Sequence, residues 1–177
     1  MKTNTLTKIF KFTFCLVICT LGLGLSASAE DPTITVFDVP GAGMGAFQGT
    51  LPQSINTNGA ITGFYIDGSD AFHGFVRAQG GTITAFDVLG AGMGAFQGTL
   101  PQSINTDGAI TGNYVDSNDV NHGFVRAKDG TITTFDAPGA GTDPGQGTLA
   151  FAIAPDGAIT GEYLDSNNVV HGFLRSQ

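Results

Sequence analysis

Short hydrophobic segments alternate with clusters of glycine, asparagine, aspartate and proline along most of the chain, and the pattern recurs every 49 residues. In the first copy, the segments at residues 53–56, 60–66, 73–78 and 82–87 are rich in β-branched and aromatic residues. Such segments between turn-forming residues are typical of β-strands. Beyond residue 29, no segment keeps a 3.6-residue apolar period with helix caps, so we expect no helix there.

The repeat defines three units, at residues 33–81, 82–130 and 131–177, without insertion or deletion. Each unit is predicted to contribute four strands, and the fourth strand runs into the next unit. The series therefore begins with a fourth-type strand at residues 33–38 and ends with a third-type strand at 171–175. Pairing these two strands, within one chain or between two, would complete the last sheet and remove two exposed edges.

Side-chain alternation predicts that both faces of each sheet are covered. If Asp129-Gly130 forms a turn, Phe124 lies opposite Phe135 on one face, while Val125 and Ile132 occupy the other. We therefore predict an all-β fold of three four-stranded antiparallel repeat units of the β-propeller-blade type. Propellers usually have about four to eight blades, so we expect a homodimer of six blades. A three-fold β-trefoil or β-prism is the alternative within a single chain.

The turns and one variable position give local predictions. Asp129-Gly130 predicts a two-residue hairpin turn in which both residues have positive φ. Pro155 fits the first central position of a type I turn, with Gly157 in the left-handed position that follows. One repeat position holds an aromatic ring, an amide and an acid in turn, which predicts solvent exposure in at least two copies. Its residues are Phe64, Asn113 and Glu162.

Two recurring phrases resemble those of a known family. Residues 54–63 read Ser-Ile-Asn-Thr-Asn-Gly-Ala-Ile-Thr-Gly, and residues 73–77 read His-Gly-Phe-Val-Arg. These phrases, present with variations in all three units, resemble the signature of bacterial extracellular repeat proteins named the HAF family, although glycine follows each histidine where the name has alanine. The resemblance implies export and propeller-like folding, usually with more repeats, and it implies no reaction.

The first 29 residues resemble an export signal rather than part of the fold. Three lysines precede an apolar segment at residues 12–25, and Ala27-Ser28-Ala29 supplies small residues for cleavage after Ala29. The apolar segment is shorter than the roughly 20 residues that span a bilayer, and no second one follows. We therefore predict a signal peptide at 1–29 and a single secreted or periplasmic repeat domain at 30–177, with no stable membrane insertion after cleavage.

Removing that segment changes the chemistry of the remaining chain. Both cysteines lie within it, so residues 30–177 contain no thiol for a disulfide, a nucleophile or a metal ligand. Four basic residues then face fifteen acidic ones, a formal net charge of −11. Nucleic acid is an unfavourable partner for such a surface, because its binding depends on clustered lysine and arginine. We expect no cofactor.

Two repeated clusters suggest metal sites, but each has a simpler structural interpretation. His73, His122 and His171 share one repeat position, and they bind a metal together only if the rings converge. Repeated hydrogen bonds to neighbouring strands or loops are the favoured interpretation, so we predict no metal site. The turn that precedes each histidine is acidic, and the second copy is a weak candidate for Ca²⁺. Its ligands would be Asp116, Asn118 and Asp119, although such residues are ordinary turn formers.

Catalysis is not expected. Arginine recurs at 77, 126 and 175, and aspartate at 38, 87 and 136, which an ion-pair or hydrogen-bond ladder between strands would explain. An active site usually combines several different groups in one cleft, whereas every unit here offers nearly the same groups. No strand-turn-helix motif positions a serine nucleophile.

Repetition suits binding better than catalysis. The loops at residues 41–53 and 90–102 are identical, so a shallow site in one would be duplicated in the other. The first functional hypothesis is a module that binds glycan or another extracellular surface ligand through Phe47, Gln48, Phe96, Gln97 and Gln146. The second is a structural or protein-interaction repeat that assembles with copies of itself through exposed sheet edges.

Overall fold

The computed structural model describes residues 31–176, so the predicted signal peptide lies outside the described residues. The chain divides after Thr35, and the compact unit that begins at Val36 carries all the strands described below. Residues 31–176 form strands, turns and bends without a helix, and hence without a helix that is long and apolar enough to cross a membrane.

Eleven strands lie within the described residues, which confirms the prediction of an all-β fold. Residues 33–81 contain three strands, and residues 82–130 and 131–177 contain four each. Because β4 pairs with β3 and β8 with β7, we count β4 with the first unit and β8 with the second, which leaves three strands for the third. The first strand of each unit begins several residues earlier than predicted, at a glycine with positive φ. The strands are β1 (Gly49–Ile55), β2 (Ile61–Ile66), β3 (Phe72–Arg77), β4 (Ile83–Phe86), β5 (Gly98–Ile104), β6 (Ile110–Val115), β7 (Asn121–Arg126), β8 (Ile132–Phe135), β9 (Gly147–Ile153), β10 (Ile159–Leu164) and β11 (Val170–Arg175).

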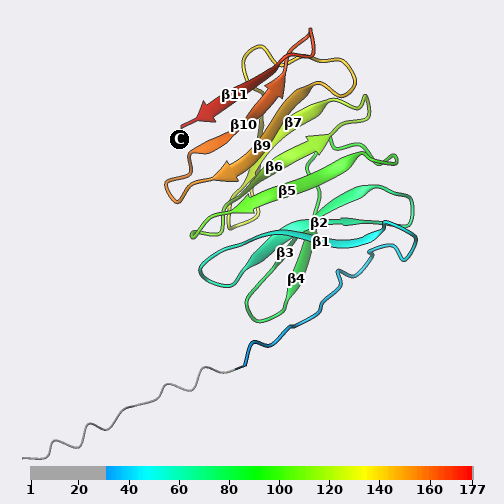
Figure 1. Ribbon diagram of the computed structural model, residues 1–177, viewed down its shortest axis with the longest axis vertical. Helices are drawn as coiled ribbons and strands as arrows, with labels where there is room; N and C mark the ends of the chain where they lie inside the picture. The colour runs from blue at the N-terminus through cyan, green and yellow to red at the C-terminus, as the bar shows by residue number, and fades with distance from the viewer. Residues whose placement is uncertain (1–30, 177) are drawn as a thin grey trace, which may run out of the picture. The chain divides into compact units, whose positions relative to one another are not determined.

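The strands form one open mixed sheet (Figure 1). Neighbouring strands within a unit pair antiparallel, and successive units are joined by short parallel pairings, Phe72 with Gly98 and Asn121 with Gly147. The hydrogen-bonded path runs β1-β2-β3-β5-β6-β7-β9-β10-β11, while β4 pairs with β3 and β8 pairs with β7. β1 and β11 are therefore the two ends of the sheet.

The hydrophobic core lies between successive units rather than within one of them. Ile104, Ile110 and Phe124 of the second unit are buried, and Val76 from the first unit packs against them. A second cluster around Ala150 and Ile159 contacts Val125 and Phe173 in the same way. Each unit therefore buries its apolar face only against a neighbour, as expected of a repeat array.

One aromatic ring bridges each pair of units. Phe86 lies edge-on to Phe124, with 6.2 Å between the ring centroids, and the guanidinium of Arg126 stands 4.8 Å from the centroid of Phe86. Equivalent contacts join Phe37 to Phe75 and Arg77, and Phe135 to Phe173 and Arg175. These arginines stack on phenylalanine rings rather than pairing with the aspartates of the predicted ion-pair or hydrogen-bond ladder. Asp87 and Asp136 instead form hydrogen bonds across the strands with His73 and His122.

The predicted strand at residues 33–38 does not form, although residues 170–175 form β11 as expected. A fourth-type strand pairs only with the third strand that precedes it, as β4 does with β3 and β8 with β7. Among the described residues no strand pairs with this segment, and a segment without a partner strand is not ordered as a strand. β11 correspondingly pairs with β10 alone.

Two local predictions were also wrong. In the turn after β7, Gly130 has a φ of 97° while Asp129 keeps negative φ, and the N–H of Gly130 donates to the carbonyl of Ala127. A type I turn followed by a left-handed glycine replaces the predicted two-residue turn. Asn113 is buried and Phe64 and Glu162 are half-buried, so this position is not exposed in any copy. Phe64 packs on Phe72 and Asn113 donates to Asn121, each on the next strand of its own unit.

Candidate functional site

The most polar repeated cluster of the fold surrounds the histidine of each third strand. His73 lies near the start of β3 and stacks on Tyr65 of β2, with 4.9 Å between the ring centroids and 22° between the ring planes. His122 stacks on Tyr114 and His171 on Tyr163 in the same geometry. The antiparallel register places each histidine directly opposite its tyrosine, so the strand pairing itself creates the stack.

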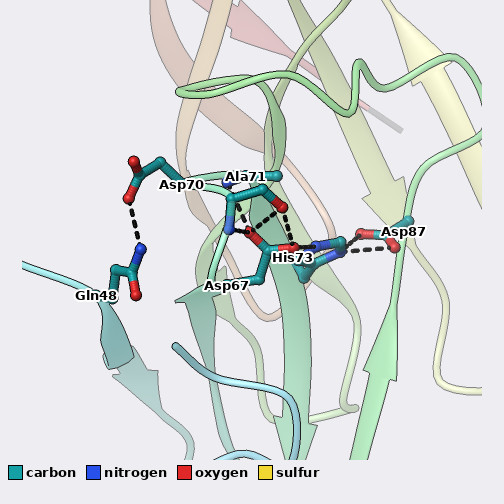
Figure 2. Close-up of polar contacts among 7 residues, drawn as sticks. Gln48, Asp67, Asp70, Ala71, His73 and Asp87 are labelled. Atoms are coloured by element: carbon teal, nitrogen blue, oxygen red, sulfur yellow. Dashed lines mark hydrogen bonds and ion pairs between the residues drawn. The ribbon is translucent and has the colours of Figure 1, made fainter. Parts of the chain in front are cut away.

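Both ring nitrogens of His73 face carboxylates (Figure 2). Nδ1 lies 3.0 Å from Oδ2 of Asp87, just beyond the end of β4, and Nε2 lies 3.4 Å from Oδ2 of Asp67, in the turn after β2. The second unit repeats the arrangement: Nδ1 of His122 lies 3.0 Å from Asp136 and Nε2 lies 3.7 Å from Asp116. The two aspartates reach the histidine from different elements, which only the sheet brings together.

The third cluster is incomplete. Nε2 of His171 lies 3.4 Å from Asp165, but no described residue forms a hydrogen bond with Nδ1. The histidine side chains are 11%, 23% and 42% exposed from the first unit to the third. In the first two units this partner is the aspartate that follows the fourth strand, and no strand follows β11 within the described residues.

The aspartate of the turn stabilises its own loop. Oδ1 of Asp67 accepts hydrogen bonds from the N–H groups of Ser69 and Ala71, at 2.8 and 3.0 Å. Burial alone would raise the pKa of Asp67, but the N–H groups of Ala71 and Ser69, the Ser69 hydroxyl and His73 together lower it. In the second unit, burial alone would raise the pKa of Asp116. The hydrogen bonds that its carboxylate accepts, chiefly from the N–H groups of Val120 and Asn118, outweigh burial and lower the pKa. In the third, the N–H groups of Val169 and Asn167 lower the pKa of Asp165.

The glutamines predicted to contact a ligand hold loops together. Oε1 of Gln48 accepts from the N–H of Gly45 at 2.9 Å, and Nε2 donates to Oδ1 of Asp70 at 2.9 Å (Figure 2). Gln97 links Gly94 to Asp119 in the same way, and buried Gln146 links Asp143 to Asn168. Both ends of each amide are therefore engaged within the protein. Each glutamine links the loop before the first strand of its unit to the turn that precedes the histidine of the same unit.

The two predicted aromatic contacts have different surroundings. Phe47 and Phe96 have positive φ, at 65° and 64°, which places their rings away from the strand that follows. Phe47 is 97% exposed, whereas Phe96 is 70% exposed and lies edge-on to Phe72 of the preceding unit, with 6.3 Å between centroids. The third unit has Gly145 at this position, with a φ of 82°. No described aromatic ring packs on Phe47 in the way that Phe72 packs on Phe96.

The candidate calcium ligands have other hydrogen-bond partners. Oδ1 of Asp116 accepts from the N–H groups of Asn118 and Val120, and the Asn118 amide donates to Oδ2 of Asp116 at 3.2 Å. Asp119, with a φ of 63°, accepts from Gln97. These contacts describe a side-chain-stabilised turn. Residues 31–176 contain no group of three histidine, cysteine, aspartate or glutamate side chains placed to hold a metal ion.

Sequence reasoning identified the histidines, the turn aspartates and the aspartates after the fourth strands, but it did not join them into one cluster. It also did not single out Tyr65, Tyr114 and Tyr163. The constant spacing was the available signal: six residues from the turn aspartate to the histidine in all three units, and fourteen from the histidine to the next aspartate in the first two. Spacing alone does not identify hydrogen-bond partners, because Arg77 was an equally available partner for Asp87.

Comparison of the chain with protein-family models, with curated proteins and with solved structures finds no match in any of the three.

Proposed function

We propose that the chain is an exported, non-catalytic repeat protein whose units are propeller-type blades and whose role is to associate with copies of itself through open sheet edges. The observation that carries the proposal is the unequal set of strands: β3 and β7 each have a fourth strand beside them, and β11 has none. An unpaired strand edge is a template for another chain. The resemblance to the HAF family supports export and blade-like units.

The geometry of the histidine clusters supports a structural role over a catalytic one. A general base needs a ring nitrogen that is free to take a proton from substrate. In the first two units, both ring nitrogens face carboxylates, and one of those carboxylates also holds a turn together. The clusters therefore join strands and loops in the same way in the first two units.

Sedimentation of the purified chain over a wide concentration range tests the proposal. We expect the mean mass to rise with concentration, because association through sheet edges is a mass-action equilibrium. A mass that stays at the monomer value up to the highest soluble concentration would refute self-association.

A second candidate function is glycan binding through the exposed rings of Phe47 and Phe96. Its support is that two identical loops each hold a phenylalanine outward with positive φ. A glycan array with the unaltered chain and the Phe47→Ala/Phe96→Ala double variant tests it. Met44→Ala is the matched control, since Met44 is fully exposed in the same loop. We expect binding by the unaltered chain and by the control, and loss in the double variant; silence of the unaltered chain rejects this function.

A further inference from the structure

The two fourth strands, β4 and β8, each contact two units. β4 pairs with β3 of its own unit, with Gly74 opposite Phe86, Val76 opposite Thr84 and Arg77 opposite Ile83. The ring of Phe86 covers Gly74 and also packs on Phe124 of the next unit. Asp87, at the end of the same segment, completes the cluster of His73. One segment thus closes one unit and joins it to the next, and β8 repeats this with Gly123, Phe135 and Asp136.

At the C-terminal end of the sheet, the acceptor half of this junction is vacant. Rings cover Gly74 and Gly123, whereas a methyl group added at Gly172 would meet only one backbone oxygen, 4.0 Å away. Leu174, equivalent to half-buried Val76 and Val125, is 77% exposed. A hollow lies beside it, lined by Phe135, Ala137, Pro138 and Phe173. Nδ1 of His171 has no partner among the described residues.

The donor half is present at the other end of the chain. Residues 34–38 read Ile-Thr-Val-Phe-Asp and are equivalent to β4 with Asp87 and to β8 with Asp136. Ile34 is 90% exposed, and Asp38 is exposed. Phe37 already packs on Phe75 and under Arg77, as Phe86 packs on Phe124 and under Arg126. Phe37 therefore already occupies the place on the first unit that Phe86 occupies on the second.

We propose that residues 34–37 of one copy form the missing fourth strand against β11 of a second copy, and that Asp38 of the first copy completes the His171 cluster of the second. The inference rests on the proposed self-association and specifies its interface. The register of β3 with β4 transfers directly: Phe37 lies over Gly172, Thr35 opposite Leu174 and Ile34 opposite Arg175. The contact is head-to-tail, since each copy offers one donor segment and one acceptor strand.

A second copy fits this site better than the chain's own segment. Phe37 is held on Phe75 in the first unit, and β11 lies at the opposite end of the sheet (Figure 1). Releasing the segment to reach β11 would expose Phe75, which is fully buried. Between two copies, Phe37 keeps its contact with Phe75 and gains Gly172.

The glycines that begin the first strands also differ between the end of the sheet and its middle. Gly98 and Gly147 lie so close to the backbones of Phe72 and Asn121 that an added methyl group would collide with them. Gly49 has nearly the same φ, 123° against 121° for Gly98, yet nothing lies within 4 Å of the equivalent point. Gly49 thus has the backbone conformation of a glycine that contacts a neighbouring strand, and no described residue occupies that place. The proposed junction supplies Val170 of the second copy there, the equivalent of Phe72.

The junction between copies is weaker than the junctions within a chain. Ser54 and Ser103 each accept a hydrogen bond from the N–H of an isoleucine in the next unit, and Asn56 and Asn105 each donate to a carbonyl of the next unit. The third unit has Ala152 and Ala154 at these positions. The contact between copies lacks both bonds, so it dissociates on dilution while the units of one chain stay together.

Mixing two blocked variants tests the proposal. Ile34→Asp disables the donor, and Leu174→Asp disables the acceptor; both side chains are exposed in a single copy, so folding is unaffected. The full chain, processed by an exporting host, is sedimented at about 0.15 M salt to screen repulsion between acidic copies. We expect association of the unaltered chain, monomers of each variant alone, and a one-to-one dimer when they are mixed, because one intact donor and one intact acceptor remain.

Leu89→Asp is the control, since Leu89 is 96% exposed and lies outside both halves of the junction; it should associate like the unaltered chain. If the unaltered chain stays monomeric, self-association and this inference both fail. If it associates but Ile34→Asp and Leu174→Asp still associate alone, self-association stands and this interface is wrong. A mixture of the two variants that remains monomeric also overturns it.

A strengthening variant gives an independent readout. Ala152→Ser/Ala154→Asn restores both missing hydrogen-bonding side chains at the junction. We expect the dissociation constant to fall about tenfold, since two such bonds together contribute about that factor. Ala152 and Ala154 belong to the unit that carries the acceptor strand, so the restored side chains form hydrogen bonds only when a donor segment is docked. The gain must therefore disappear when Ile34→Asp is added. An unchanged dissociation constant, or a gain that survives Ile34→Asp, contradicts the proposed register.

Discussion

The side chains at two neighbouring repeat positions are matched in the first two units. In the first unit Phe64 lies edge-on to Phe72, with 5.5 Å between centroids, and in the second the Asn113 amide donates to Oδ1 of Asn121 at 3.0 Å. An aromatic ring thus packs on an aromatic ring, and an amide forms a hydrogen bond with an amide. The mixed chemistry at this position suggested exposure, but Phe64 and Asn113 each have a matching partner on the next strand.

Removing one member of the asparagine pair should therefore destabilise the fold. Asn113→Ala is expected to lower the free energy of unfolding by about 1–3 kcal/mol, because a buried carboxamide oxygen loses its donor. The Asn113→Ala/Asn121→Ala double variant should cost less than the sum of the two single variants, since the interaction is lost only once. Urea unfolding of the three variants measures this, and strict additivity would show that the pair is not coupled.

The turn aspartates should make the protein sensitive to acid. The pKa of Asp67, Asp116 and Asp165 is lowered in the folded chain from an ordinary value of 3.8. Their contribution to stability is present above that value and is lost as the pH falls through the lower folded-state pKa. Asp116→Asn keeps an oxygen acceptor for the turn and removes the titrating proton.

We expect Asp116→Asn to reduce the difference in free energy of unfolding between about pH 6 and about pH 3, relative to the unaltered chain. Denaturant unfolding at the two pH values measures it. Asp107→Asn, at an exposed turn position, is the control. An identical pH dependence for Asp116→Asn and the unaltered chain would contradict this role of Asp116.

At the scale of elements, short-range rules succeeded where one residue constrains its own backbone. Pro155 predicted a type I turn with Gly157 in the left-handed region, and Gly59, Gly108 and Gly157 all have positive φ, between 73° and 88°. The prediction of positive φ at Asp129 was wrong because aspartate tolerates positive φ without requiring it. The prediction of a strand at residues 33–38 was wrong for a different reason: a strand needs a partner strand, and no strand of the described residues pairs with them.

Gly49 and Gly98 begin equivalent strands with nearly the same positive φ, but only Gly98 lies against a neighbouring backbone. Substituting both distinguishes the cost of the backbone conformation from the cost of a steric collision. Gly49→Ala should cost about 1–3 kcal/mol for its positive φ alone. Gly98→Ala should cost a further 1–3 kcal/mol or so, because its methyl group would also collide with the backbone of Phe72. Thermal and urea unfolding of both variants, measured in the dissociated state, gives the comparison. Equal destabilisation would show that the junction yields to the methyl group.

At the scale of the whole molecule, stability should be graded along the sheet. The middle unit is covered on both sides, and the end unit with β11 is covered on one. In the dissociated Leu174→Asp variant, we expect the amides of β6 to exchange with solvent at least about a hundredfold more slowly than those of β11. Hydrogen exchange followed by mass spectrometry measures this. Equal protection of the two strands would show that the array unfolds as one unit.

The sequence by itself determined the three equivalent units, the all-β fold and most strand positions, because these depend on the periodicity of side chains and on turn residues a few positions apart. Only the tertiary structure decided that Asp87 faces His73 while Arg77 stacks on Phe37, that the predicted ligand glutamines tie loops together, and that Asn113 is buried. Those outcomes depend on which strands meet across a junction between units. Identical residues gain different partners at the middle and at the ends of the sheet, and a repeating sequence carries no mark of that difference.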